Sequence, residues 1–230
     1  MRRSIRIFAA GLVLGSLALP GVAEEVGVAL RVHKEVRGHE VGESEREIRQ
    51  NDPIERGLTV FLRGPDPYLK VAFTFGGCST LKGIRNHRFT GTASLDGLTE
   101  VDFGDPNDPK ASRIKLAVGK MRVAMLPEAG CHVDVDTPSA LLVLGAVVRV
   151  LALPVLGTFV GVDQGSATVQ AKAGGAPVVV KAGNWVVVPP GGLPTRPAPL
   201  PPGDDDEILQ DPPLLGCCDA VGTPKPPAGH

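Results

Sequence analysis

Three residues with metal-binding side chains stand at alternate positions of one short segment. His132, Asp134 and Asp136 are separated by Val133 and Val135. Alternate side chains of a β-strand point to the same face, so an imidazole and two carboxylates would lie together and offer ligands to a divalent cation. A solvated polar face opposite a buried one gives the same pattern, and we favour this second interpretation.

A second group of oxygen-bearing side chains stands in a predicted loop. Asp102, Asp105, Asn107 and Asp108 lie close together, with Pro106 among them and Pro109 directly after them. Their carboxylate and amide oxygens are the ligands that Ca²⁺ prefers. The EF-hand pattern is absent, and Asp, Asn and Pro are the usual residues of tight turns. We therefore predict a turn here, with calcium binding as the alternative.

The four cysteines are Cys78, Cys131, Cys217 and Cys218. Zinc sites use pairs of ligands spaced by a few residues, and the adjacent Cys217 and Cys218 do not provide such a pair. Cys78 and Cys131 each follow a glycine at the edge of a predicted strand, so a disulfide between them is a candidate. Buried thiols that pack as small apolar side chains are the alternative.

Motifs of the common enzyme classes are missing from the sequence. It contains no Gly-x-Ser-x-Gly, no phosphate-binding glycine loop ending in Lys-Ser or Lys-Thr, and no His-Glu-x-x-His. The carboxylates are scattered, and no two stand out by spacing as a general acid and base. We therefore predict no catalytic residue, no cofactor and no enzymatic activity.

The composition is that of a folded protein without a nucleic-acid-binding surface. The 230 residues include 24 Lys and Arg against 25 Asp and Glu, for a formal net charge of -1. The basic residues are dispersed, whereas binding to nucleic acid needs a basic cluster. Hydrophobic residues make up 43% of the chain, enough for a core, and the 29 glycines and 22 prolines predict many turns.

The N-terminus has the order of a secretory signal peptide. Arg2, Arg3 and Arg6 precede an apolar run over residues 7–19, and small residues surround a cleavage point after Ala23. The apolar run is too short to cross a bilayer as a helix. We expect residues 1–23 to be removed on export, leaving a periplasmic or secreted protein without a membrane span. Disulfides persist in such a compartment.

From residue 24 to residue 192, short segments alternate apolar and polar side chains. Val28, Leu30 and Val32 form one such run, and others lie at residues 69–75, 114–118, 121–125, 178–180 and 185–188. A period of two between glycine- and proline-containing turns predicts strands with one buried face. The sequence therefore predicts an all-β fold, a twisted sandwich or roll of about a dozen short strands.

Residues 139–162 are apolar enough to resemble a transmembrane helix. Arg149 lies near the centre, however, and a charge there opposes insertion into a bilayer. Pro154, Gly145 and Gly157 also interrupt the segment, and β-branched residues are frequent. We therefore predict three buried strands.

The composition changes at residue 193. Ten of the 22 prolines lie in residues 193–230, together with an acidic run at residues 204–207. Such a segment cannot bury enough apolar surface to fold alone. We expect a signal peptide at 1–23, one β domain at 24–192 and a disordered Pro-rich tail at 193–230.

Several short motifs resemble the FecR domain of bacterial envelope proteins when taken in order. They are Asn51-Asp52 with Gly57 and Thr59-Val60, Leu69–Phe73 with Gly76–Thr80, Lys115–Val123, Val133–Ala140 with its Thr137-Pro138-Ser139-Ala140, Gly157–Val169, and Val178–Gly183 with Trp185–Val188. The resemblance covers residues 28–192. It departs at Leu144-Gly145-Ala146, where the family has Arg-Gly-Thr. The sequence also lacks the cytoplasmic anti-sigma region and transmembrane helix that better-known members carry before the domain.

The resemblance implies a non-catalytic envelope protein whose domain binds or scaffolds another protein. We expect an envelope protein partner of unknown identity, contacted through exposed strand edges and the tail. One alternative is a periplasmic sensing partner in sigma-factor-type signalling, which would need an inner-membrane partner. Another is an envelope protein that binds a small molecule, a glycan or a metal.

Overall fold

The structure, a computed structural model, describes residues 24–40, 42–64, 66–73, 91–104, 113–125, 132–145 and 147–200. These residues form strands and turns without a helix, which confirms the predicted all-β class. Within the same residues, no helix is long and apolar enough to cross a membrane.

The described residues contain sixteen strands in one hydrogen-bonded sheet. In chain order they are β1 (Glu25–His33), β2 (Val36–His39), β3 (Arg46–Glu47), β4 (Pro53–Glu55), β5 (Leu58–Leu62), β6 (Tyr68–Phe73), β7 (Gly91–Phe103), β8 (Arg113–Met125), β9 (Val133–Asp136), β10 (Ala140–Leu144), β11 (Val147–Leu153), β12 (Gly157–Gln164), β13 (Ser166–Ala171), β14 (Val178–Lys181), β15 (Asn184–Val188) and β16 (Ala198–Pro199).

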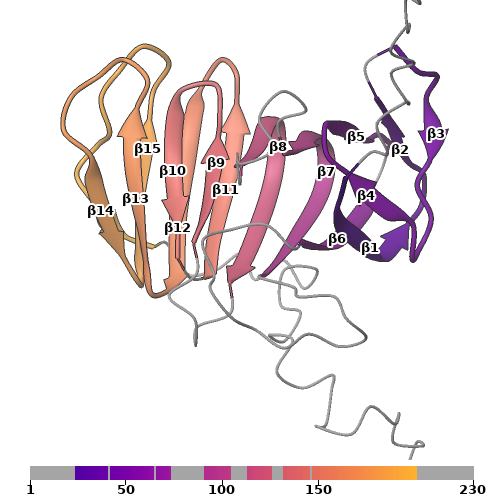
Figure 1. Cartoon of the computed structure of the whole chain (residues 1–230). Helices are drawn as coiled ribbons and strands as arrows, with labels where there is room; N and C mark the ends of the chain where they lie inside the picture. The colour runs from indigo at the N-terminus through magenta and orange to yellow at the C-terminus, as the bar shows by residue number, and fades with distance from the viewer. Residues whose placement is uncertain are drawn as a thin grey trace, which may run out of the picture.

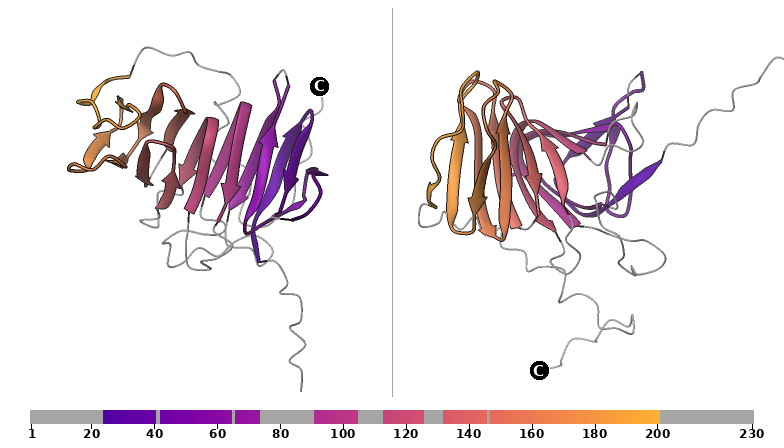
Figure 2. Two further views of the ribbon diagram at one scale, coloured as in Figure 1. Left: turned by 90° about the horizontal axis from the view of Figure 1, so that it is seen from above. Right: turned by 60° about the vertical axis from the view of Figure 1, so that its left-hand side comes forward.

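Two long antiparallel strands, β7 and β8, form a central ribbon from which the sheet divides (Figure 1). The first half of β7 pairs with β6 and its second half with β5. Residues 119–124 of β8 pair with β11, whereas residues 113–115 pair in parallel with β9. Figure 2 shows the ribbon between the N-terminal strands and the C-terminal strands from two further sides.

Four branches therefore leave the ribbon. On the N-terminal side they are β6-β1-β4 and β5-β2-β3, and on the C-terminal side β9-β10-β13-β14 and β11-β12-β15-β16. We call the last two the β14 branch and the β16 branch. Strands such as β5, β10 and β13 alternate buried and more exposed residues, as a strand with one face in the core does. In β6 and the first half of β7 nearly every residue is buried. The buried side chains form one continuous cluster.

The ribbon bends where Gly119 of β8 meets Thr99 of β7. Gly119 has a φ of +107°, and a Cβ there would lie 2.6 Å from Thr99 Cα and collide with Thr99 Oγ1. The Thr99 hydroxyl donates to Asp96 O at 2.5 Å and accepts from Lys120 N at 3.2 Å. The backbone polar groups at the bend therefore have partners although the ladder is interrupted there.

The bend also reverses which residues of β8 face the core. Ile114 and Leu116 are buried before it, whereas Met121 and Val123 are buried after it. The register shift between Glu100 and Val101 of β7 skips Ala117 of β8 in the pairing. One extra residue moves every following side chain to the other face. The two halves of β8 can therefore serve two different branches.

The structure corrects the expected buried face of the first strand. Val26 and Ala29 are buried in β1, while Val28 and Leu30 are only half-buried. Register shifts in the pairing of β1, one after Glu25 and one after Ala29, displace the alternation. Such shifts depend on the neighbouring strands β4 and β6, so the period of β1 alone does not show them.

Other expected strands are confirmed. The apolar segment 139–162 forms β10, β11 and β12, and the runs at 69–73, 178–180 and 185–188 lie in β6, β14 and β15. The described chain extends to Leu200, and residues 198–199 form β16. The first residues of the expected tail therefore lie beside β15, while residues 201–230 and the expected signal peptide lie outside the described residues.

We expect Gly119→Ala to destabilise the fold more than Gly174→Ala. The two glycines share nearly the same φ, +107° and +103°, but a Cβ at Gly174 has nothing within 4 Å. Backbone strain is thus common to both variants, and the collision with Thr99 adds about 1–3 kcal/mol at Gly119 alone. Urea unfolding measures this difference. Equal losses of unfolding free energy would show that Thr99 moves aside at no cost.

Candidate functional site

The predicted polar trio lies at and before β9, on the outer face of the β14 branch. Asp134 and Asp136 are half-buried and His132 is exposed, while Val133 and Val135 between them point into the core. Asp136 Oδ1 lies 2.6 Å from Lys172 Nζ in an ion pair. Within the described residues, no three His, Cys, Asp or Glu side chains come together as a metal site.

The other residues singled out from the sequence are placed only in part. Asp102 lies in β7 and pairs with Lys115 of β8, its Oδ2 3.6 Å from Lys115 Nζ. The remaining residues of that loop, 105–108, and all four cysteines, Cys78 and Cys131 included, lie outside the described residues. The disulfide between Cys78 and Cys131 stays a prediction.

Three hydroxyl side chains meet in the core between the two C-terminal branches. Thr137 and Ser139 belong to the turn between β9 and β10, and Thr158 belongs to β12. All three are buried, with exposed fractions of 6% or less. Thr158 Oγ1 lies 2.7 Å from Thr137 Oγ1 and 2.8 Å from Ser139 Oγ. We call this group the hydroxyl triad.

The hydroxyl triad is satisfied by the backbone at both ends. Ala140 N donates to Thr137 Oγ1 at 3.1 Å, and Ser139 Oγ donates to the carbonyl oxygen of Val188 in β15 at 2.9 Å. Each hydroxyl can donate one proton and accept others, so the contacts form a chain without an unpaired buried group. The triad joins the turn of one branch to two strands of the other.

Gly157, next to Thr158 of the triad, must be a glycine because the backbone of Val188 and Pro189 lies against it. It has a φ of +108°, and a Cβ there would collide with Val188 O and lie 2.9 Å from Pro189 Cα. Gly157 therefore lets β12 approach β15 within the β16 branch, whereas Thr137, Ser139 and Thr158 join that branch to the β9–β10 turn. The sequence motifs contain these residues but do not predict that they meet. The one indication in the sequence is the presence of hydroxyl side chains inside apolar segments.

Three exposed aliphatic side chains share the outer face of the β14 branch. Leu141 and Val143 of β10 are 37% and 41% exposed, and Val179 of β14 is 56% exposed. Val143 stands opposite Thr168 of β13, which in turn stands opposite Val179. We call this surface, made by Leu141, Val143, Thr168 and Val179, the aliphatic face. Period-two reasoning finds these strands but not which neighbours bring the three side chains together.

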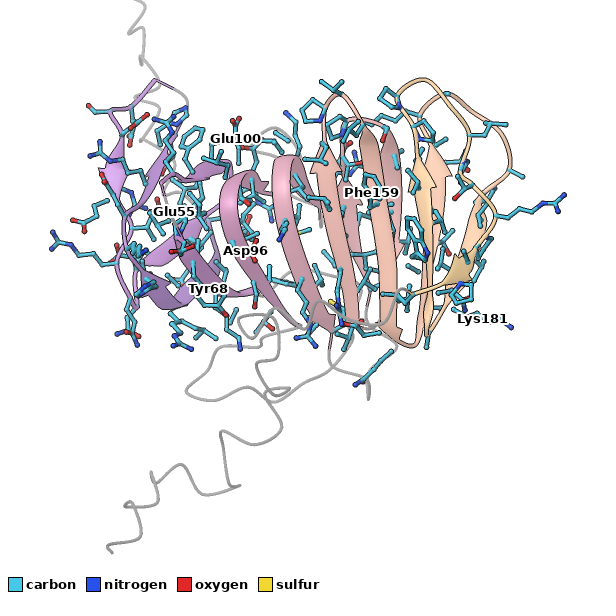
Figure 3. All side chains as sticks on the ribbon, turned by 180° about the vertical axis from the view of Figure 1, so that it is seen from behind. Glu55, Tyr68, Asp96, Glu100, Phe159 and Lys181 are labelled. Atoms are coloured by element: carbon cyan, nitrogen blue, oxygen red, sulfur yellow. The ribbon has the colours of Figure 1, made fainter. Side chains whose placement is uncertain are left out.

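The outer face of the β16 branch is different. Phe159 of β12, labelled in Figure 3, stacks on Trp185 of β15 with ring centroids 6.2 Å apart and planes 5° apart. Beside them, Leu200 lies in ordinary contact distance of the position that a Cβ of Gly161 would take. The end of the described chain thus covers part of this face.

Arg149, the charged residue in the apolar segment 139–162, lies in an ion-pair network with Arg122 and Asp163. Its Nε is 2.9 Å from Asp163 Oδ1, and Arg122 Nε is 3.6 Å from Asp163 Oδ2. The carboxylate of Asp163 therefore balances two guanidinium groups at the surface of β8, β11 and β12. Such partly exposed pairs contribute little to stability.

A carboxyl pair lies at the other end of the molecule. A hydrogen bond from protonated Glu40 to Glu55, and then loss of hydration and the charges of Glu55 and Glu43, raise the pKa of Glu40 above its usual value. Arg46 opposes this shift, and its Nη2 lies 3.5 Å from Glu55 Oε2. Two carboxyls that share a proton can act as an acid and a base, but this pair lies among solvated charges.

Comparison with known proteins adds no relative to this description. A scan against models of protein families and a search of curated proteins both found no match for the chain.

We expect Thr158→Val to lower the free energy of unfolding by about 1–3 kcal/mol, because it keeps the side-chain shape and leaves the hydroxyls of Thr137 and Ser139 without their shared partner. Thr168→Val is the matched control, since Thr168 is half-exposed on β13. That change should stay within about 0.5 kcal/mol. Similar effects of the two substitutions in urea unfolding would contradict the role of the triad.

Glu40→Gln should flatten the pH dependence of stability. A raised pKa means that the folded state holds the proton more tightly, so its stabilising contribution is present below the ordinary glutamate pKa and is lost as pH rises through the raised pKa. At pH 7 the variant should be more stable by about 0.5 kcal/mol or less. Unfolding at acidic and neutral pH, with Glu100→Gln as control, measures the effect. An unchanged pH profile would refute the shared proton.

Proposed function

We propose that this chain is a non-catalytic, exported envelope protein whose FecR-like β domain binds another protein. The aliphatic face is the observation that carries this proposal. Single exposed apolar residues are ordinary on protein surfaces. Here Leu141, Val143 and Val179 are brought onto one face by neighbouring strands in register.

The aliphatic face can contribute to binding by burying its apolar side chains against a partner. Removing apolar surface from water contributes about 25 cal/mol for each Å², and the face has no charged side chain of its own. At its margin lie Asp134 opposite Val143 and the ion pair of Asp136 with Lys172. An apolar centre with a polar rim is the usual anatomy of a protein–protein interface.

The residues that carry the FecR resemblance support the same function. Gly119 sets the bend of the ribbon, Gly157 allows the close approach of β12 to β15, and the hydroxyl triad joins the two C-terminal branches. These buried or close-packed residues act in the architecture, so recognition falls to the exposed side chains of the sheet. Export through the predicted signal peptide would place the domain in the envelope, where an envelope protein is the expected partner.

The experiment compares two lysine substitutions in capture of partners from envelope extract. Val143→Lys places a charge on the aliphatic face and is tolerated by the fold because Asp134 stands opposite. Val155→Lys, on a hairpin tip where Val155 is 85% exposed, is the matched control. We expect Val143→Lys to reduce recovery of the captured protein by about tenfold, a loss near 1.4 kcal/mol.

The control should recover the partner like the wild-type chain. Equal recovery by both variants would exclude the aliphatic face as the binding surface. Failure of the wild-type chain to retain any protein under stabilising cross-linking would contradict the proposed function itself.

A further inference from the structure

Four strands among the described residues pair on one side only, namely β3, β4, β14 and β16. Unpaired strand edges invite pairing with another chain, and proteins block them with short length, charge or proline. β3 is Arg46–Glu47, β4 begins with Pro53, and β16 is Ala198–Pro199. β14, in contrast, has four residues, Val-Val-Val-Lys, and no proline.

The hydrogen-bond pattern identifies which groups of β14 face outward. Ala182 N donates to Gly165 O at 3.0 Å at the end of the β13–β14 pair. Hydrogen-bonded pairs alternate along an antiparallel ladder, so Val180 turns its backbone groups toward β13 in the same way. Val179 and Lys181 lie between these positions. Their N–H groups and the Val179 C=O therefore point to the open edge, while the Lys181 C=O accepts a hydrogen bond from Asn184 Nδ2 at 3.4 Å.

We propose that β14 receives an extended segment of a partner protein as an additional strand. This inference rests on the proposed function and specifies the partner. The N–H groups of Val179 and Lys181 and the C=O of Val179 would supply the ladder, as in other cases of strand addition. The added strand would continue the aliphatic face beyond Val179, so its outward residues would be apolar beside Val179 and acidic beside Lys181.

Lys181 distinguishes such a partner from a second copy of this chain. It is exposed at the end of the molecule, as Figure 3 shows. In a two-fold antiparallel pairing that puts Val179 opposite Lys181 of the other copy, the two lysines fall on one face about 8 Å apart. Like charges at that distance disfavour self-pairing, whereas an acidic strand gains attraction from the same side chain.

The test uses the full chain and two fluorescent peptides, one alternating valine and glutamate and one alternating valine and lysine. We expect the glutamate peptide to bind more tightly by about tenfold, near 1.4 kcal/mol. Lys181→Glu should reverse that preference. Equal binding of the two peptides, or a preference that Lys181→Glu leaves unchanged, would overturn the proposal.

Val179→Pro removes an N–H from the open edge and leaves the β13 ladder intact, because that N–H does not face β13. We expect it to weaken peptide binding by about tenfold, whereas Val179→Ala should retain binding. Circular dichroism verifies the fold of both variants. If Val179→Pro fails to fold, the peptide preference of Lys181→Glu decides whether β14 receives the added strand. Unchanged binding to folded Val179→Pro would overturn strand addition.

Two other segments could pair with the open edge of β14, and each would give a distinct result. A wild-type dimer in sedimentation that Val179→Pro dissociates would replace the partner with a second copy. Peptide binding only after removal of residues 201–230 would replace it with the chain's own terminal segment. Partner capture lost in Val143→Lys but kept in Val179→Pro would leave the proposed function standing and overturn the edge inference alone.

Discussion

The close approach of Gly119 to Thr99 is the constraint on which the branching of the sheet depends. A straight ribbon would present one continuous edge on each side, and each edge would bind a single flat sheet. Because a residue without a Cβ stands at position 119, the two strands can bend together, and the Thr99 hydroxyl takes the Lys120 N–H that the interrupted ladder releases. Each edge is thereby divided between two branches. The reversal of the buried face in β8 at this point then directs both halves toward a common core.

The hydroxyl triad solves a second problem that the bend creates. Two branches that diverge from the ribbon must be held together, and apolar packing alone is non-directional. Thr137, Ser139 and Thr158 provide directed contacts between the β9–β10 turn and the strands β12 and β15. A buried polar chain favours one arrangement over its neighbours only when every member has a partner, and here the Val188 carbonyl and the Ala140 N–H complete it. The three buried hydroxyls are thus explained by their part in the architecture.

The local pattern of apolar and polar residues predicted the strands. It failed to predict features that depend on which strands lie side by side. The runs at 69–73 and 139–162 were predictable because side chains alternate in or out of the core whatever strand lies beside them. The buried face of β1 was not, since register shifts against β4 and β6 displaced Val28 from the core. The same limit applies to the candidate site. The sequence predicted that Asp134 and Asp136 share a face, but the ion pair of Asp136 with Lys172 depends on residues that only the sheet order brings together. The aliphatic face depends on β14 adding beside β13, which no motif indicates.

The two C-terminal branches differ in how their outer strands end, and this difference limits where a partner strand can add. Residues 195–200 run along β15, where Thr195 exchanges hydrogen bonds with Val187 and Leu200 N donates to Gly183 O. The prolines at positions 197 and 199 leave few donors on the outside of that segment. The chain therefore closes the edge of the β16 branch with its own residues and covers part of its aromatic face. The β14 branch keeps both its edge and its aliphatic face, and because Val179 belongs to both, a strand that pairs there also extends the apolar surface available for binding.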